Sequence, residues 1–170
     1  MKYGYFDDER KEYVITTPFT PLPWINYLGA EGFFGLISNT CGGYDFYKDA
    51  KLRRITRFRY NSVPLDTGGR CFYIADGDCT WSPAYRPAGV LPEGYRCRHG
   101  LGYSVFEGEL KGLRAQLTCF VPLGENCEVQ RLVLKNESGE RKDLRVYAAV
   151  EWCLWDAVDV ADNFQRNYST

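Results

Sequence analysis

The 170-residue sequence has few of the features that mark a membrane, secreted or nucleic-acid-binding protein. No apolar run approaches the roughly 20 residues of a membrane span. Residues 1–13 (MKYGYFDDERKEY) are charged and aromatic, whereas a signal peptide has an apolar core. The 21 Lys and Arg residues nearly balance the 22 Asp and Glu residues, so no basic surface for nucleic acid is indicated. We therefore expect a cytoplasmic protein without a membrane or nucleic-acid partner.

Paired cysteine motifs are also lacking, although the chain has seven cysteines. Their number is odd, they are spread over the whole chain, and no C-x-x-C pair occurs, so neither a disulfide framework nor a closed zinc site is indicated. Cys97 and His99 alone supply too few ligands for a metal. We predict seven free thiols, no metal and no cofactor. The apolar content of 45% indicates one globular domain with a proper core.

Sustained helical periodicity is absent, whereas short strand patterns with turn residues between them are frequent. The predicted strands are 13–17, 53–60 with a wet, basic face, 71–76 paired with 79–82 in a hairpin, 102–110, 113–121, 128–136 and 144–152, while 83–94 is a predicted loop. Lys111-Gly112 forms a tight turn, after which Leu113, Ala115, Leu117, Cys119 and Val121 line one face of a strand. This pattern predicts an all-β fold, a large antiparallel β-sandwich.

The segment from Thr17 to Lys48 is the richest in aromatic, proline and glycine residues. Three prolines between Pro18 and Pro23 exclude a helix interior or a central strand, so an extended, well-packed segment is expected there. Its aromatic side chains, Trp24 and Tyr27 among them, have two interpretations. They either close the open end of the sandwich as part of its core or form a wall that stacks on sugar rings.

This segment and its neighbours resemble a known family. The stretches MKYGYFDDERKEYVITTPFTPLPWINYLG and GFFGLISNTCGGYDFYKDAKLRRITRFRYNSVPLDTGGR are similar to the amino terminus of the cellobiose phosphorylase family, inverting glycoside phosphorylases of family 94. The resemblance covers residues 1–170 but only the front part of such an enzyme. It implies a supersandwich domain that is incomplete at its C-terminal end, and a catalytic helical barrel that lies outside this chain.

The resemblance also implies a function and a site. Enzymes of this family use inorganic phosphate as co-substrate to convert cellobiose, a β-linked disaccharide, to α-glucose 1-phosphate and glucose. They work as homodimers, in which this domain covers one side of the active-site pocket. The resemblance implies that Arg166 and, more weakly, Gln165 lie near the sugar pocket. An arginine suits this role because its planar guanidinium donates several hydrogen bonds to sugar hydroxyls. No catalytic residue is expected in this chain, which alone should be inactive.

Other residues invite chemical roles that the sequence supports less well. His99, the only histidine, could be a general base, but no nucleophile arrangement accompanies it, and we expect a structural histidine at a turn. Three aspartates recur at every third residue and would share a solvated helical face: Asp156, Asp159 and Asp162. Asp156 could also cap the helix. A paired-carboxylate glycosidase, a free-standing carbohydrate-binding module and a structural dimerisation domain remain alternatives.

Overall fold

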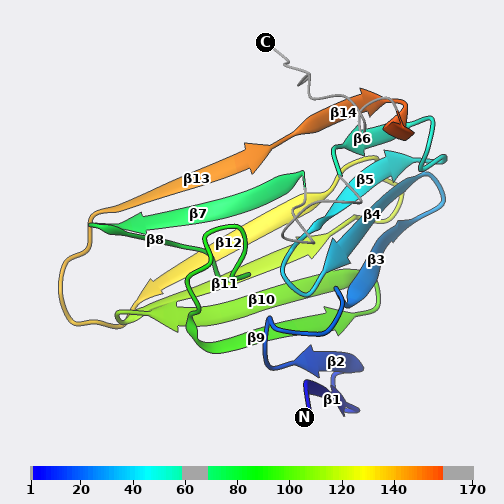
Figure 1. The fold of residues 1–170 in the computed structure, drawn as a ribbon. Helices are drawn as coiled ribbons and strands as arrows, with labels where there is room; N and C mark the ends of the chain where they lie inside the picture. The colour runs from blue at the N-terminus through cyan, green and yellow to red at the C-terminus, as the bar shows by residue number, and fades with distance from the viewer. Residues whose placement is uncertain (1, 59–68, 159–170) are drawn as a thin grey trace.

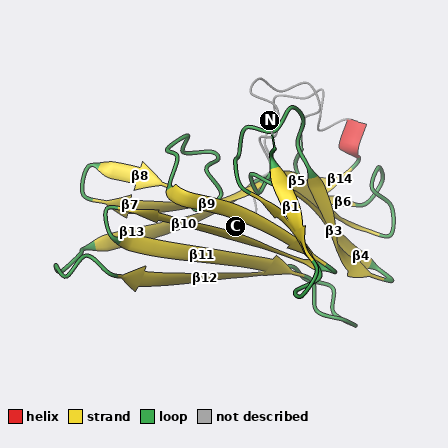
Figure 2. Ribbon diagram, turned by 90° about the horizontal axis from the view of Figure 1, so that it is seen from below, coloured by secondary structure: helices red, strands yellow, loops and turns green. Residues whose placement is uncertain are grey.

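The computed structural model describes residues 2–58 and 69–158 as an antiparallel β-sandwich (Figure 1). Two smaller sheets lie side by side and cover one face of a six-stranded sheet. Figure 2, seen from below, places the six-stranded sheet in front. The predicted all-β sandwich is confirmed. A helical turn begins at Ala157, and no helix in the described ranges is long and apolar enough to cross a membrane.

The six-stranded sheet contains the most regular part of the sequence. Its order is β1 (Gly4–Asp7), β2 (Glu12–Ile15), β9 (Glu93–Gly100), β10 (Tyr103–Leu110), β11 (Leu113–Phe120) and β12 (Val129–Asn136). Lys111 and Gly112 have φ values of 51° and 72°, as a tight hairpin turn requires. The predicted inward face of β11 is confirmed, because its alternate residues from Leu113 to Cys119 are fully buried.

The second layer consists of two sheets that meet at Glu151. One has the order β14 (Trp152–Trp155), β6 (Arg54–Thr56), β5 (Gly43–Tyr47), β4 (Phe33–Ser38) and β3 (Ile25–Ala30). The other has the order β13 (Leu144–Val150), β7 (Arg70–Asp76) and β8 (Cys79–Trp81). The Glu151 N–H donates to Gly69 O at 2.6 Å, and the Arg57 N–H donates to Glu151 O at 2.8 Å, so the chain passes from one sheet to the other.

Two apolar clusters fill the space between the layers. The larger one joins β3 and β4 to the six-stranded sheet and includes Leu28, Ile37, Phe106 and Leu117. The smaller one packs Ile74 and Trp81 of the three-stranded sheet on Leu113 and Ala115 of β11. Each small sheet therefore has its own core against the shared large sheet.

A buried charged cluster lies where the three sheets approach one another. Arg70 Nε donates to Glu128 Oε1 at 2.8 Å, and Arg70 Nη1 lies 3.7 Å from Asp45 Oδ2. Gln130 Nε2 also donates to Glu128 Oε1, at 2.5 Å. Burial raises the pKa of Glu128 to about 8 against the pull of Arg70, and the neighbouring Asp45 adds to the rise. The Glu128 carboxyl therefore keeps its proton at neutral pH.

Several sequence-based expectations were wrong in detail. Within the described residues, the strand expected over 53–60 is only β6 (Arg54–Thr56). On its expected wet, basic face Arg53 is exposed, but Arg57 is only 3% exposed, and Arg59 lies outside the described residues. Arg54, on the opposite face, is also 3% exposed. Arg54 stacks on the Tyr44 ring at 3.7 Å, which gives its charge a partner inside the fold. The strand expected over 144–152 is divided at Glu151, because the chain changes sheet there. The aromatic meander β3–β5 was not predicted as strands.

Candidate functional site

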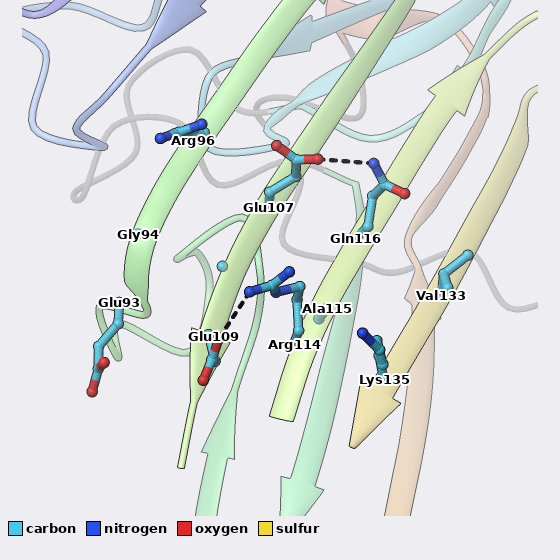
Figure 3. Close-up of a pocket in the computed structure, with 11 residues that line it drawn as sticks. Glu93, Gly94, Arg96, Glu107, Glu109, Arg114, Ala115, Gln116, Val133 and Lys135 are labelled. Carbon is cyan, nitrogen blue, oxygen red and sulfur yellow. Dashed lines mark hydrogen bonds and ion pairs between the residues drawn. The ribbon is translucent and has the colours of Figure 1, made fainter. Parts of the chain in front are cut away.

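A polar groove of about 480 Å³ crosses the outer face of the six-stranded sheet, over β9 to β12 (Figure 3). Its walls carry three acidic and three basic side chains: Glu93, Arg96, Glu107, Glu109, Arg114 and Lys135. Gln116 and Val133 also line it, and none of its described lining residues is aromatic. A groove of this volume is large enough for a small ligand.

Strand alternation explains how these side chains come together. Successive residues of a strand point to opposite faces, so the buried residues of β10 and β11 leave Glu107, Glu109, Arg114 and Gln116 on the outer face. The pairing of β9 and β10 shifts register between Glu107 and Glu109. Gly94 lies at this bulge with a φ of 61°, and nothing lies within 4 Å of where its Cβ would be. The bulge therefore opens the groove above Gly94.

One end of the groove is held in place by a hydrogen-bond network. Glu107 Oε1 accepts from Gln116 Nε2 and Arg98 Nη2, both at 2.9 Å. Arg98 also contacts Glu12 at 3.1 Å, and Tyr103 Oη donates to the same Glu12 carboxylate at 2.7 Å. Burial works against the charge of Arg98, but the two carboxylates raise the pKa of its guanidinium. Glu107 is therefore fixed in one orientation at the groove wall.

The other end has looser contacts. Arg114 Nη2 lies 3.5 Å from Glu109 and 3.3 Å from Glu137, and Lys135 Nζ lies 2.6 Å from Glu137. The hydrogen bond from Lys135 lowers the pKa of the Glu137 carboxyl, so this group is ionised at neutral pH. Exposed ion pairs of this kind contribute little to stability and exchange partners easily.

Glu93 and Arg96 contribute charges to the groove that the protein does not use. Both are exposed, and neither side chain makes a hydrogen bond or ion pair with another described residue. With three charges of each sign, the groove attracts neither anions nor cations strongly. Its donors and acceptors suit a neutral ligand with many hydroxyl groups. Within the described ranges, no group of three or more His, Cys, Asp or Glu residues could hold a metal.

The sequence-predicted substrate residues, Arg166 and Gln165, lie outside the described residues, as do Asp159 and Asp162. Asp156 is described, and its Oδ1 accepts from the Val158 N–H at 2.8 Å. The predicted cap is therefore confirmed.

His99 lies within β9, and the prediction that it sits at a turn was wrong. Its Nε2 donates to Trp24 O at 3.1 Å, so Nδ1 is the acceptor of the Ser104 hydroxyl at 2.8 Å. Burial lowers the pKa of the imidazole. Both ring nitrogens are engaged inside the protein, in agreement with a structural histidine.

The aromatic side chains of residues 17–48 divide between the two interpretations. Trp24 packs on the main core with Tyr13, and Phe33 is buried. Phe34 and Phe46 stack on each other at 5.3 Å, and Tyr27 is 60% exposed. The core role is confirmed for Trp24 and Phe33, whereas sugar contact stays a prediction for the others.

The groove residues were missed at the sequence level, although a signal was present. Acidic residues alternate along β10 opposite polar and basic residues along β11, and the turn fixes the pairs Glu107↔Gln116 and Glu109↔Arg114. The contribution of β9 depends on the bulge at Gly94 and on pairing between strands, which the sequence pattern does not reveal.

The fold defines a class, the antiparallel β-sandwich in which two small sheets cover one large sheet. The family model "Glycosyl hydrolase 94, supersandwich domain" matches residues 11–170, and the chain therefore belongs to glycoside hydrolase family 94.

Curated relatives agree with this assignment. The chain is 44% identical over 156 residues to an N,N'-diacetylchitobiose phosphorylase of Vibrio proteolyticus, covering 89% of this chain and 19% of the relative. A protein of the same name from Vibrio furnissii is 41% identical over 98% of this chain and 21% of its own length. The 3-O-beta-D-glucopyranosyl-beta-D-glucuronide phosphorylase of Paenibacillus borealis is 34% identical over 86% of this chain and 18% of its own length. The chain thus spans about a fifth of these relatives.

Proposed function

We propose that this chain is the amino-terminal domain of a glycoside phosphorylase that cleaves a β-linked disaccharide with inorganic phosphate. The observation that carries the proposal is the family match over residues 11–170, together with relatives named as phosphorylases. In the proposed reaction an acid protonates the glycosidic oxygen, and phosphate attacks the anomeric carbon from the opposite face. The products are an α-glycosyl 1-phosphate and a free sugar.

The proposed role of the domain is to cover one side of the active-site pocket and to take part in a homodimer. The catalytic acid and the phosphate site belong, in this proposal, to a helical barrel outside the present sequence, and no cofactor is used. A cytoplasmic location fits the seven free cysteines, which would oxidise in a secreted protein.

Two disaccharides are candidates for the substrate. The sequence resemblance indicates cellobiose, whereas the two Vibrio relatives are named for N,N'-diacetylchitobiose. Their identities of 44% and 41% favour the second candidate for this domain. The intact protein should be incubated with phosphate and each disaccharide, and the sugar 1-phosphate measured. Residues 1–170 alone should release none, and a lack of activity of the intact protein on every β-linked disaccharide would contradict the proposal.

Arg166 is the proposed substrate residue, with Gln165 beside it. In the intact protein, Arg166→Ala should lower kcat/KM for the disaccharide about ten- to hundred-fold, the loss expected for a charged hydrogen bond. The apparent affinity for phosphate should change little. Arg166→Lys should restore only part of the activity, because a point charge lacks the fork geometry. Unchanged kinetics in the Ala variant would remove Arg166 from the site.

The alternative is a carbohydrate-binding module or a dimerisation domain without any catalytic partner. The polar groove is the observation that favours a binding module. The gene sequence downstream of codon 170 distinguishes these functions, because the phosphorylase proposal requires a continuing frame that encodes a helical barrel.

A further inference from the structure

We propose that the outer-face groove binds a neutral β-linked saccharide at a site separate from the one proposed for Arg166. The inference rests on the proposed function for the class of ligand, and it goes beyond that function because it assigns a second site. The residues that would hold the ligand are Glu93, Arg96, Glu109 and Arg114, with Glu107 and Gln116 at one end (Figure 3).

The first argument is chemical. Carboxylate, guanidinium and amide groups are planar and offer two hydrogen-bonding atoms side by side, which match adjacent hydroxyls of a pyranose ring. The groove holds all three kinds of group on one sheet face. Its charges cancel, three against three, so a phosphate or a nucleic acid would gain no net attraction there.

The second argument is that the groove is partly preorganised. Glu107 is held by Gln116 and Arg98 at 2.9 Å, which removes the entropy cost of ordering it on binding. The side chains of Arg96 and Glu93 are without a partner among the described residues. The contacts of Arg114 with Glu109 at 3.5 Å and with Glu137 at 3.3 Å are exposed ion pairs, which a ligand can replace at little cost. The protein therefore offers hydrogen-bonding groups at little cost to its own contacts.

The third argument is shape. The open space above Gly94 and the volume of about 480 Å³ admit a short saccharide lying across β9, β10 and β11. Because none of the described lining residues is aromatic, the proposed binding depends on hydrogen bonds rather than on stacking. Binding should therefore weaken strongly when the arginine guanidinium groups are removed.

The test uses the intact protein and isothermal titration with two probes, a β-1,4-linked glucose tetrasaccharide and its N-acetylglucosamine counterpart. The double variant Arg96→Ala/Arg114→Ala should weaken saccharide binding at one site per chain at least ten-fold. Its kcat/KM for disaccharide phosphorolysis should stay within about two-fold of the unmodified protein. The control is Arg131→Ala, which removes an exposed arginine from the same face of β12 outside the groove and should leave binding unchanged.

A second variant, Val133→Trp, fills the groove without removing charge and should abolish the same binding. Thermal unfolding of each variant checks that the fold is kept. The groove proposal would be overturned if every variant bound both tetrasaccharides as the unmodified protein does. It would also be overturned if no binding were found outside the active site. If the unmodified protein showed no phosphorolysis, this would contradict the proposed function instead, so the two failures are distinguishable.

Discussion

Three ionisable side chains lie inside the sandwich, where isolated charges are costly: Glu128, Asp45 and Arg70. Asp45 Oδ1 and Glu128 Oε2 lie 2.9 and 3.0 Å from the point where a Gly35 Cβ would be, and neither accepts a hydrogen bond from a described donor. The proton that Glu128 keeps at neutral pH reduces the negative charge that faces Arg70. A side chain at position 35 would separate these groups.

The proton on Glu128 predicts how stability depends on pH. In the unfolded chain Glu128 titrates near 4.5, whereas its pKa in the folded protein is about 8. Between these pH values the folded state keeps a proton that the unfolded state has lost. The contribution of Glu128 to the free energy of unfolding therefore falls as pH rises. The slope is roughly 1.4 kcal/mol per pH unit. Glu128→Gln, which is neutral and isosteric, should make the profile flatter between about pH 5 and pH 8.

Urea unfolding of both proteins over this pH range measures the effect. Glu125→Gln, which changes an exposed carboxylate in the preceding turn, is the control and should leave the slope as it is. A Glu128→Gln profile as steep as that of the unmodified protein would place the proton on another group.

At the scale of elements, the glycines of two hairpin turns differ in what a side chain at their positions would meet. Gly77 and Gly112 both have positive φ, 59° and 72°. A Cβ on Gly112 would lie 2.8 Å from Ser138 Cα, whereas a Cβ on Gly77 would meet nothing within 4 Å. Gly77→Ala should therefore cost about 1–2 kcal/mol for its φ alone, and Gly112→Ala should cost about 1–3 kcal/mol more because of the clash.

Chemical denaturation of the two glycine variants gives the comparison directly. Gly77→Ala is the internal control, since both changes carry the same penalty from positive φ. Equal losses of stability would mean that the 137–143 connection moves aside without cost, and would contradict the packing argument.

β13 is an edge strand, and its only described partner is β7. Val146, Tyr147 and Val150 are 45%, 52% and 45% exposed. An apolar edge of this kind pairs readily with other chains. Val146→Lys should therefore reduce light scattering of the 170-residue chain on heating, because a charged edge resists pairing. Val158→Lys, at an exposed valine outside the sheets, is the control. Equal aggregation of both variants would exclude this edge as the cause.

At the scale of the whole molecule, all seven cysteines are free, as the sequence predicted. Burial raises the pKa of the Cys97 thiol, and a hydrogen bond with Cys41 together with burial raises that of Cys119. Thiols that stay protonated react slowly. We therefore expect a colorimetric thiol reagent to modify Cys127, the exposed one, first in the native protein, and to find seven thiols after denaturation without a reductant. Two or more stable disulfides would contradict the proposed cytoplasmic location.

The sequence by itself determined the strands of the regular hairpins and their faces. Alternation from Leu113 to Cys119 and the Lys111-Gly112 turn are local signals, because side chains alternate along any strand and tight turns require φ > 0. The family resemblance also came from the sequence, through the stretches 1–29 and 32–70, and it implied the role of Arg166, which lies outside the described residues. These predictions needed no knowledge of which strands are neighbours.

Only the tertiary structure decided which distant residues meet. Asp45 and Arg70 lie in the two different small sheets, and Glu128 immediately precedes β12 of the large sheet. Arg57 is buried although its local pattern indicates a wet face. The groove forms because β9 pairs with β10 through a bulge at Gly94. Contacts between sheets depend on strand order and register, which arise from the packing of the whole core rather than from the pattern of any one segment.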